Sequence, residues 1–290
     1  MIKKYLDLLL NSFNNKAKMS IVIADLDDSI ISFMDLEEMV NLMLTNKNYY
    51  GKIKQKSLII EWNEIKYRIY NINTIFWMTC EKGYISYAKS LIRRYKVKID
   101  IHDSNECAFR CAGSSGHYNV TAWLIKLGET GHGKINIHAN YEETFRFACG
   151  SGHYEITKWL IKLGETKYGK VNIHSNYECA FKWSCANGHY DIAKWLISLG
   201  EANYEKINIH ADKVFAFKWA CANGHYEIAK WLISLGEDNY GKINIHANDE
   251  EIFRLACANG HYDIAKWLIS LGETNYEKIS QETISQFFLQ

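Results

Sequence analysis

Apolar and polar residues repeat along most of this chain at a fixed interval of 36 residues. The tripeptide Gly-His-Tyr begins at Gly116, Gly152, Gly188, Gly224 and Gly260, and a fainter copy of the surrounding pattern is centred on Gly83. After each of the five clear glycines, Tyr, an Ile or Val and then Trp-Leu-Ile place apolar side chains on one side of a helix. A second apolar segment, with a Phe seven residues before the glycine, precedes each one. The pattern therefore predicts a helix pair per unit, and six units between residues 71 and 275.

The segments between units share the sequence Gly-Glu-x-x-Tyr-Gly-Lys-Ile-Asn-Ile-His or a close variant. They are rich in turn-forming residues and too short for a further helix, so they predict loops or hairpins, here called finger loops. The chain contains no Pro, so Gly, Asn and Asp must form its turns. One helix pair cannot bury its apolar face alone, and the units are expected to stack as a solenoid with capped ends. Residues 276–290, with Ile279, Ile284, Phe287 and Phe288, predict a capping half-repeat.

The last complete unit resembles an ankyrin repeat. Between Phe253 and Gly272, Ala-Cys takes the place of the family's Ala-Ala pair and Gly-His follows, while Ile243-Asn takes the place of its Val-Asn. The resemblance covers residues 71–275 and implies an all-α ankyrin-repeat solenoid that binds other proteins. This long, tryptophan-bearing, proline-free variety is similar to the large ankyrin families of giant DNA viruses of amoebae. That similarity implies a viral protein acting in the host cytoplasm.

The chain departs from the ankyrin pattern in two ways. The Thr-Pro-Leu-His opening of the inner helix is absent and is replaced, for example, by Glu143-Thr-Phe-Arg146, so its hydrogen bonds must be made another way. The unit is also longer than the usual 33 residues, and the extra residues fall in the finger loop, as at Thr166–Gly169. Insertions are tolerated in such loops, and binding surfaces lie there.

Side chains at strict repeat spacing are expected to pack rather than react. The tryptophans Trp123, Trp159, Trp195, Trp231 and Trp267 and the cysteines Cys80, Cys149, Cys185, Cys221 and Cys257 are therefore expected in the core. Ten of the 11 histidines form two ladders, one after the glycines and one in the finger loops. Helices packed about 8–10 Å apart hold equivalent histidines too far from one another for one zinc ion. We expect the ladders to orient the turns by hydrogen bonds.

The remaining chemical candidates are few. Cys107 and Cys111, with His102 and His117, could be drawn as a zinc site, but their spacing fits no common zinc pattern. No nucleophile elbow, phosphate-binding loop, paired-carboxylate signature or His-Glu-x-x-His occurs. The sequence therefore predicts no enzyme activity, no metal and no cofactor.

Charge argues against nucleic acid and membranes as partners. The 34 basic and 33 acidic residues leave a formal charge of +1, and no apolar run reaches the ~20 residues that span a bilayer. A basic ladder lies six residues before the glycines: Arg110, Arg146, Lys182, Lys218 and Arg254. Acidic residues precede four of these by one helical turn, as Glu106 precedes Arg110, and should neutralise them. No secretory signal is evident at the start, and the expected location is the cytoplasm.

Residues that vary between near-identical units are the candidates for recognition. Those at the start of the inner helices are Tyr141, Glu143, Tyr177, Cys179, Lys213, Phe215, Asp249 and Glu251. Those at the finger tips are His132, Tyr168, Tyr204 and Tyr240. Together they are expected to line the concave side that repeat proteins use for partners. The predicted function is a non-catalytic scaffold that binds a partner protein.

Residues 1–70 lack the repeat and predict short amphipathic helices. Within them, Ile30-Ile-Ser-Phe-Met34 followed by Asp35-Leu36 resembles the first helix of an F-box, although Val22-Ile23 replaces the usual Leu-Pro. The F-box-like positions are Leu26, Ile30, Ile31, Phe33, Met34, Leu36, Leu42 and Leu44. A plain cap over Phe76 and Trp77 of the first unit would show a similar apolar rhythm. The F-box resemblance implies a substrate adaptor that grips the Skp-type adaptor of a cullin ubiquitin ligase.

Overall fold

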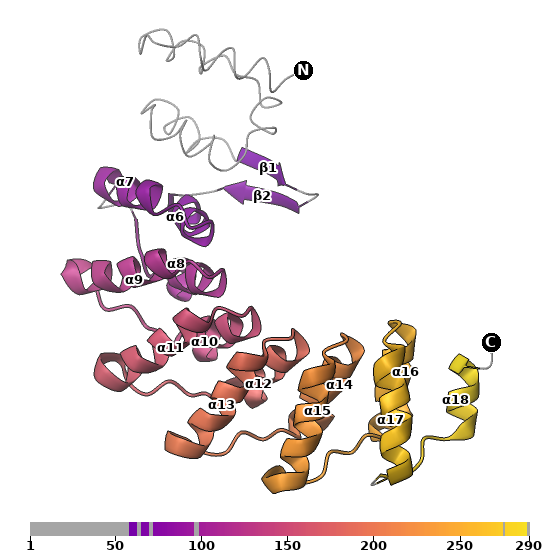
Figure 1. Ribbon diagram of the computed structural model, residues 1–290. Helices are drawn as coiled ribbons and strands as arrows, with labels where there is room; N and C mark the ends of the chain where they lie inside the picture. Colours follow the sequence, from indigo (N-terminus) through magenta and orange to yellow (C-terminus); the bar gives the residue numbers. More distant parts are fainter. Residues whose placement is uncertain (1–57, 63–64, 70–71, 96–98, 275, 289–290) are drawn as a thin grey trace.

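The computed structural model describes residues 58–288 except 63–64, 70–71, 96–98 and 275, and this part contains a stack of helix pairs (Figure 1). The first helices of the pairs, here called inner helices, are α6 (Ile72–Glu81), α8 (Asp103–Ser114), α10 (Ala139–Gly150), α12 (Ser175–Ala186), α14 (Ala211–Ala222) and α16 (Ala247–Ala258). The outer helices are α7 (Ile85–Tyr95), α9 (Tyr118–Leu127), α11 (Tyr154–Leu163), α13 (Tyr190–Asn203), α15 (Tyr226–Leu235) and α17 (Tyr262–Thr274). The π-helical turns η2 (Gly128–His132), η3 (Gly164–Tyr168) and η4 (Gly236–Tyr240) extend three outer helices, and α18 (Gln281–Phe288) follows the last pair.

The stack is curved, and the inner helices line the inside of the arc (Figure 1). Each inner helix packs directly on the next, from α6 through α16 to α18, whereas consecutive outer helices approach one another much less. Closer spacing on one side of a stack bends it towards that side. The predicted helical solenoid of helix-turn-helix units is therefore confirmed.

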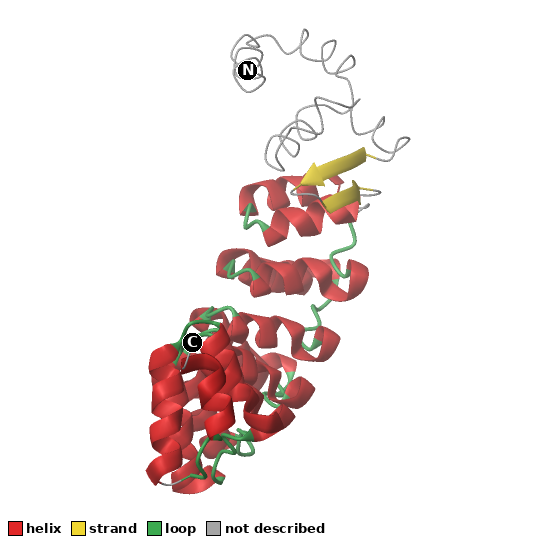
Figure 2. Ribbon diagram, turned by 90° about the vertical axis from the view of Figure 1, so that its right-hand side faces the viewer, coloured by secondary structure: helices red, strands yellow, loops and turns green. Residues whose placement is uncertain are grey.

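The helical prediction for residues 1–70 is wrong over its described part. Strand β1 (Leu58–Trp62) pairs with β2 (Ile65–Ile69) in an antiparallel hairpin, with Leu58 opposite Ile69 and Trp62 opposite Ile65. The hairpin lies at the end of the stack beside the first helix pair (Figure 2). Both strands are rich in Ile and aromatic residues, and β2 alternates apolar with polar, which is the period of a strand.

The core follows the repeat. The phenylalanines seven residues before each glycine, from Phe76 to Phe253, are fully buried, and so are the predicted core cysteines. The tryptophans differ from the prediction, because they lie on the outer helices and are only partly buried. Each still packs on its neighbours: the Trp231 ring centroid lies 6.3 Å from that of Phe181 and 5.3 Å from that of Tyr190.

Every inner helix from α8 to α16 begins with a left-handed turn. Three consecutive residues have φ between 53° and 63°, as at Asn140, Tyr141 and Glu142. For residues with a side chain this conformation costs about 1–2 kcal/mol each. Asn and Asp tolerate it best among these residues, and four of the five turns hold one of them at the first position, while Ser104 begins the other. This turn replaces the Thr-Pro-Leu-His opening, and other contacts must stabilise it.

Side chains of the same repeat close this turn from two directions. The guanidinium of Arg146 donates to the carbonyls of Tyr141 (2.6 Å) and Asn140 (3.0 Å), and Arg110 does the same one repeat earlier. The Glu142 carboxylate, at the end of the turn, lies 2.8 Å from Nδ1 of His138. The finger-loop histidines therefore orient the turn, as the sequence predicted.

The same groups also join each repeat to the next. The backbone N–H of Asn172 donates to the Glu142 carboxylate (3.2 Å), and Nε2 of His138 donates to the carbonyl of Tyr168 (3.0 Å). We call these the carboxylate lock and the histidine lock. Both cross to the neighbouring finger loop, so one pair of side chains holds the strained turn and the stacking together.

The five junctions from His102 to Ser280 do not all have both locks. Both are present where His102 and His138 stand. At His174 and His246 the carboxylate lock remains, while each Nε2 is buried without a partner. At His210 the histidine lock remains (2.9 Å), but Val214 occupies the place of the glutamate. Every one of these junctions therefore keeps at least one lock.

A single finger-loop position decides whether the histidine lock forms. Gly133, Gly169 and Gly241 have φ between 88° and 96°, and the carbonyl just before each accepts from the histidine. The corresponding residues in the other two loops are Glu205 and Glu277, which lack this positive φ. There α13 and α17 continue as ordinary α-helix instead of a π-helical turn.

Exchanging the residue that forms the carboxylate lock should move stability in opposite directions at two junctions. Glu142→Val leaves the Asn172 N–H without its acceptor and is expected to cost about 1.5–3 kcal/mol. Val214→Glu places a carboxylate beside His210 and removes a β-branched residue from a left-handed position, and is expected to stabilise by about 1 kcal/mol. Urea unfolding of the full chain measures both, and a shift of equal sign would contradict the lock.

A substitution at Gly133 tests whether the histidine lock requires glycine at this finger-loop position. Gly133→Ala puts a Cβ 2.8 Å from Nε2 of His102 at φ 96°, and is expected to destabilise the chain by about 1–3 kcal/mol. Glu205→Ala is the matched control in a loop without positive φ, and should change stability by less than about 0.5 kcal/mol. Thermal unfolding compares the two; equal effects would show that the backbone conformation is not what matters.

The two histidine ladders have different electrostatic surroundings. Burial alone lowers the pKa of His138, but the Tyr168 carbonyl and the Glu142 carboxylate outweigh it, and its pKa is raised above 6.5. The His153 ring, in the ladder after the glycines, packs over Gly116. Burial lowers its pKa below 6.5, although the Ser114 carbonyl opposes this, and His225 behaves alike.

These shifts predict opposite pH dependences. The stability contributed by His138 is fully present below pH 6.5 and is lost as the pH rises through its raised pKa. The stability contributed by His153 is present above pH 6.5 and is lost as the pH falls towards its lowered pKa. NMR titration of the imidazoles should show His138 titrating above His153, and Glu142→Gln should lower the pKa of His138 alone. A common midpoint for both would contradict the assignment.

Candidate functional site on the inner helices

The variable residues at the start of the inner helices fall into two groups. Tyr141 and Tyr177 are 82% and 80% exposed, and Lys213 and Asp249 are also exposed. All four occupy the middle of a left-handed turn, whose backbone points their side chains away from the stack. These four side chains are exposed, although Asp249 pairs with Arg254 at 3.2 Å, and their contact with a partner stays a prediction.

The second group is engaged within the stack, which the sequence did not predict. Glu143 forms an ion pair with Arg110 of the preceding repeat, and Glu251 lies 3.4 Å from Nζ of Lys218. Cys179 is buried and contacts Nη1 of Arg146, while Phe215 has Lys182 5.3 Å from its ring centroid. This position varies because each residue must match the basic residue of the repeat before it.

The predicted neutralisation of the basic ladder by the preceding glutamates of the same helix is therefore wrong. Glu106 lies beside His102, and Arg110 pairs with Glu143, 33 residues further on. Lys182, buried to the same degree as Arg146, pairs with Asp212 at 2.6 Å. The left-handed turn rotates the glutamate away from the helix face that an i,i+4 spacing assumes. Three of the five basic residues pair with an acid of the next repeat, whereas Arg254 pairs with Asp249 of its own repeat and Arg146 donates to backbone carbonyls.

The finger-loop aromatic residues are not free tips. The Tyr168 ring has Nζ of Lys134 4.2 Å from its centroid, and its hydroxyl donates to Glu129 at 3.0 Å. Burial and that carboxylate raise the pKa of Tyr168 to about 12. Tyr240 and Tyr204 are likewise covered by Lys206 and Lys170. His132 is half-buried, and its carbonyl accepts the histidine lock. These residues pack one finger loop on the next.

Sequence reasoning missed a set of apolar residues five positions before each glycine. Phe147 is 47% and Trp183 is 44% exposed, and Trp219 and Leu255 follow at the same position on the next two inner helices. The rings of Trp183 and Phe215 meet edge to face at 5.3 Å, and Trp219 lies 6.0 Å from Phe215. We call Phe147, Trp183, Phe215, Trp219 and Leu255 the inner aromatic face. The sequence could have indicated this face, because the position five residues before each glycine varies between repeats but always holds an apolar residue.

The zinc alternative finds no support in the described residues. Both ring nitrogens of His102 are engaged, with Glu106 and with the carbonyl of His132. The sulfurs of Cys107 and Cys111 are 3.7 Å apart, and no group of three potential metal ligands occurs in the described part. In that part, too, no helix is both long and apolar enough to cross a membrane. The F-box-like residues Leu26 to Leu44 lie outside the described residues.

Comparison with known proteins identifies the repeats. The family model described as "Ankyrin repeats (3 copies)" matches residues 202–279, which include α14 to α17. No curated protein matches the chain. The same helix pairs continue outside the matched segment, so the fold is an all-α ankyrin solenoid whose described part also carries an N-terminal hairpin. The matched family is a repeat family, which is typical of non-catalytic interaction proteins.

Proposed function

We propose that this ankyrin solenoid is a non-catalytic scaffold that binds a partner protein through the inner aromatic face, with Tyr141 and Tyr177 at its border. The observation that carries the proposal is the exposed Trp183, packed on Phe215 on the inside of the arc. Four of the six exposed large apolar side chains in the described part lie on inner helices. In the proposed division, residues 71–275 supply this surface and 276–290 cap it.

The chemistry of this face suits a protein surface or peptide. Clustered exposed apolar side chains mark interaction sites, and Trp and Tyr carry much of the binding energy in interfaces. Tyr141 and Tyr177 add contact area at small cost in side-chain entropy. Beneath the face, Lys182 is paired with Asp212, and the Arg146 guanidinium is buried against the carbonyls of its own turn, so neither cation is presented as in a basic groove for nucleic acid. All eight cysteines are free, which suits the cytoplasm, of a host cell if the protein is viral.

The proposal is tested with peptides selected from a random display library on the full chain. Trp183→Ser with Trp219→Ser should weaken the selected peptides at least 10-fold, since loss of an aromatic hot spot costs about 2 kcal/mol or more. Tyr262→Ser is the matched control, because it removes an aromatic residue that is 50% exposed on an outer helix. Fluorescence anisotropy measures affinity. Peptides that bind the double variant as tightly as the original chain would overturn the proposal.

A second candidate is a substrate adaptor of a cullin ubiquitin ligase, and it rests on the Ile30–Leu36 motif. It predicts micromolar or tighter binding of a purified Skp-type adaptor to the full chain. Ile30→Asp with Leu42→Asp should abolish that binding while the helical circular dichroism stays unchanged. The absence of binding to the original chain would remove this candidate and leave the scaffold proposal intact.

A further inference from the structure

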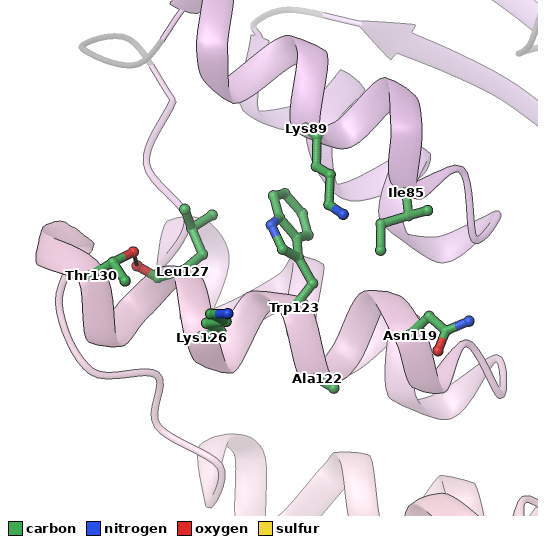
Figure 3. Close-up of a pocket in the computed structure, with 8 residues that line it drawn as sticks. All are labelled: Ile85, Lys89, Asn119, Ala122, Trp123, Lys126, Leu127 and Thr130. Atoms are coloured by element: carbon green, nitrogen blue, oxygen red, sulfur yellow. Dashed lines mark hydrogen bonds between the residues drawn. The ribbon is translucent and has the colours of Figure 1, made fainter.

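A groove opens on the outer side of the solenoid between α7 and α9. It encloses about 570 Å³ and is lined mainly by α9, with Ile85 and Lys89 contributed by α7. Figure 3 shows the Trp123 indole rising from α9 towards α7, between Leu127 and Ile85. This surface lies on the opposite side of the helix pairs from the inner aromatic face.

The groove exists because the α7–α9 junction lacks the tyrosine that later junctions have two residues after the glycine. At the next four junctions the first tyrosine of an outer helix packs edge-on against the tryptophan of the following repeat, with ring centroids 5.3–5.6 Å apart. Two residues after Gly83, Ile85 occupies the place of that tyrosine. The smaller side chain leaves one edge of Trp123 uncovered, so an apolar surface is open here.

The rim of the groove is basic. Lys89 and Lys126 are exposed, and no carboxylate lines the groove. On α11 and α15 the lysine that corresponds to Lys89 is paired with an acid three residues before it, Lys158 with Glu155 at 3.1 Å and Lys230 with Glu227 at 2.7 Å. Ser86 and Asn119 hold that acid's position in α7 and α9, and neither helix contains an acidic residue. The groove therefore favours an apolar ligand with negative charges.

The chain contains such a segment before its first described residue. Residues 25–38 carry six acidic side chains, and no Lys or Arg occurs between Lys18 and Lys47. Leu26, Ile30 and Phe33 are interspersed with these acids. The residues between Glu38 and Leu58 can span up to about 60 Å when extended, several times the 8–10 Å spacing of packed helices. A tether of this length gives a local concentration of about millimolar.

We propose that residues 25–38 bind the α7–α9 groove of the same chain. Apolar side chains of the segment cover Trp123, and its carboxylates face Lys89 and Lys126. The segment would cover the Trp123 ring as a tyrosine covers the tryptophan at later junctions. Its carboxylates would neutralise Lys89 and Lys126 as a glutamate neutralises the lysine of α11 and α15. It uses a surface separate from the inner aromatic face, so it stands independently of the scaffold proposal, while its segment is the same one that the second candidate assigns to a Skp-type adaptor.

Zero-length carbodiimide cross-linking of the full chain, followed by mass spectrometry, tests the contact. Amide links are expected from Lys89 or Lys126 to carboxylates of residues 25–38. Lys162, which occupies the position of Lys126 one repeat later, is the internal control and should form at least fivefold fewer links. Links spread evenly over Lys126 and Lys162 would overturn the proposal.

A variant that keeps every linking group separates specific docking from random encounter. Leu26→Ser, Ile30→Ser and Phe33→Ser together should reduce the links to Lys89 and Lys126 at least fivefold, and undiminished links would contradict the apolar contact. An equal mixture of ¹⁴N-labelled and ¹⁵N-labelled chains shows whether the segment comes from the same chain. Cross-links that join two peptides of the same isotope support the proposal. Cross-links that join a ¹⁴N peptide to a ¹⁵N peptide in the random proportion would assign the groove to a second copy of the chain instead. Trp183→Ser should leave the links unchanged, which distinguishes this contact from the partner-binding face.

Discussion

The stack depends on a glutamate carboxylate at the end of a left-handed turn, which is present at four of the five junctions from His102 to Ser280. Glu142 lies beside the histidine of its own repeat and accepts the backbone N–H of Asn172 in the next. Three consecutive residues at positive φ are costly, and the fold tolerates them because the same carboxylate also joins neighbouring repeats. Local conformation and stacking are therefore coupled, as nearest-neighbour contacts generally are in solenoids.

The two locks compensate for each other along the array. Val214 removes the carboxylate lock at a junction whose finger loop retains Gly241, whereas Glu205 and Glu277 remove the histidine lock where Glu178 and Glu250 remain. The exchange leaves His174 and His246 with a buried nitrogen that has no partner. These junctions resemble one another in sequence, yet they differ in the hydrogen bonds that join the repeats, so the array is not uniform.

The same coupling explains why the binding surface differs from the one that sequence variation indicated. Glu143, Cys179 and Glu251 vary because each contacts the basic residue of the preceding repeat, which is a packing requirement. Phe147, Trp183 and Trp219 vary one helical turn further along, where Phe147 and Trp183 are exposed and Trp219 is half-buried. Recognition is therefore proposed for the position whose aromatic side chains keep exposed surface although they contact the neighbouring repeat.

The sequence by itself determined the helix pairs, their 36-residue period, the buried phenylalanines and cysteines and the orienting role of the histidines, because each follows from spacing along one chain segment. Strand β2 could have been identified from its alternation of apolar and polar residues, and β1 from its content of Ile and Trp. The left-handed turns, the pairing of Arg110 with Glu143 and the covering of Tyr168 by Lys134 were decided only by the tertiary structure. The two pairings join residues about one repeat apart, and such contacts exist only once the repeats have stacked. The turns reverse the helical sense that an i,i+4 spacing assumes, and they are stabilised by hydrogen bonds to the next repeat.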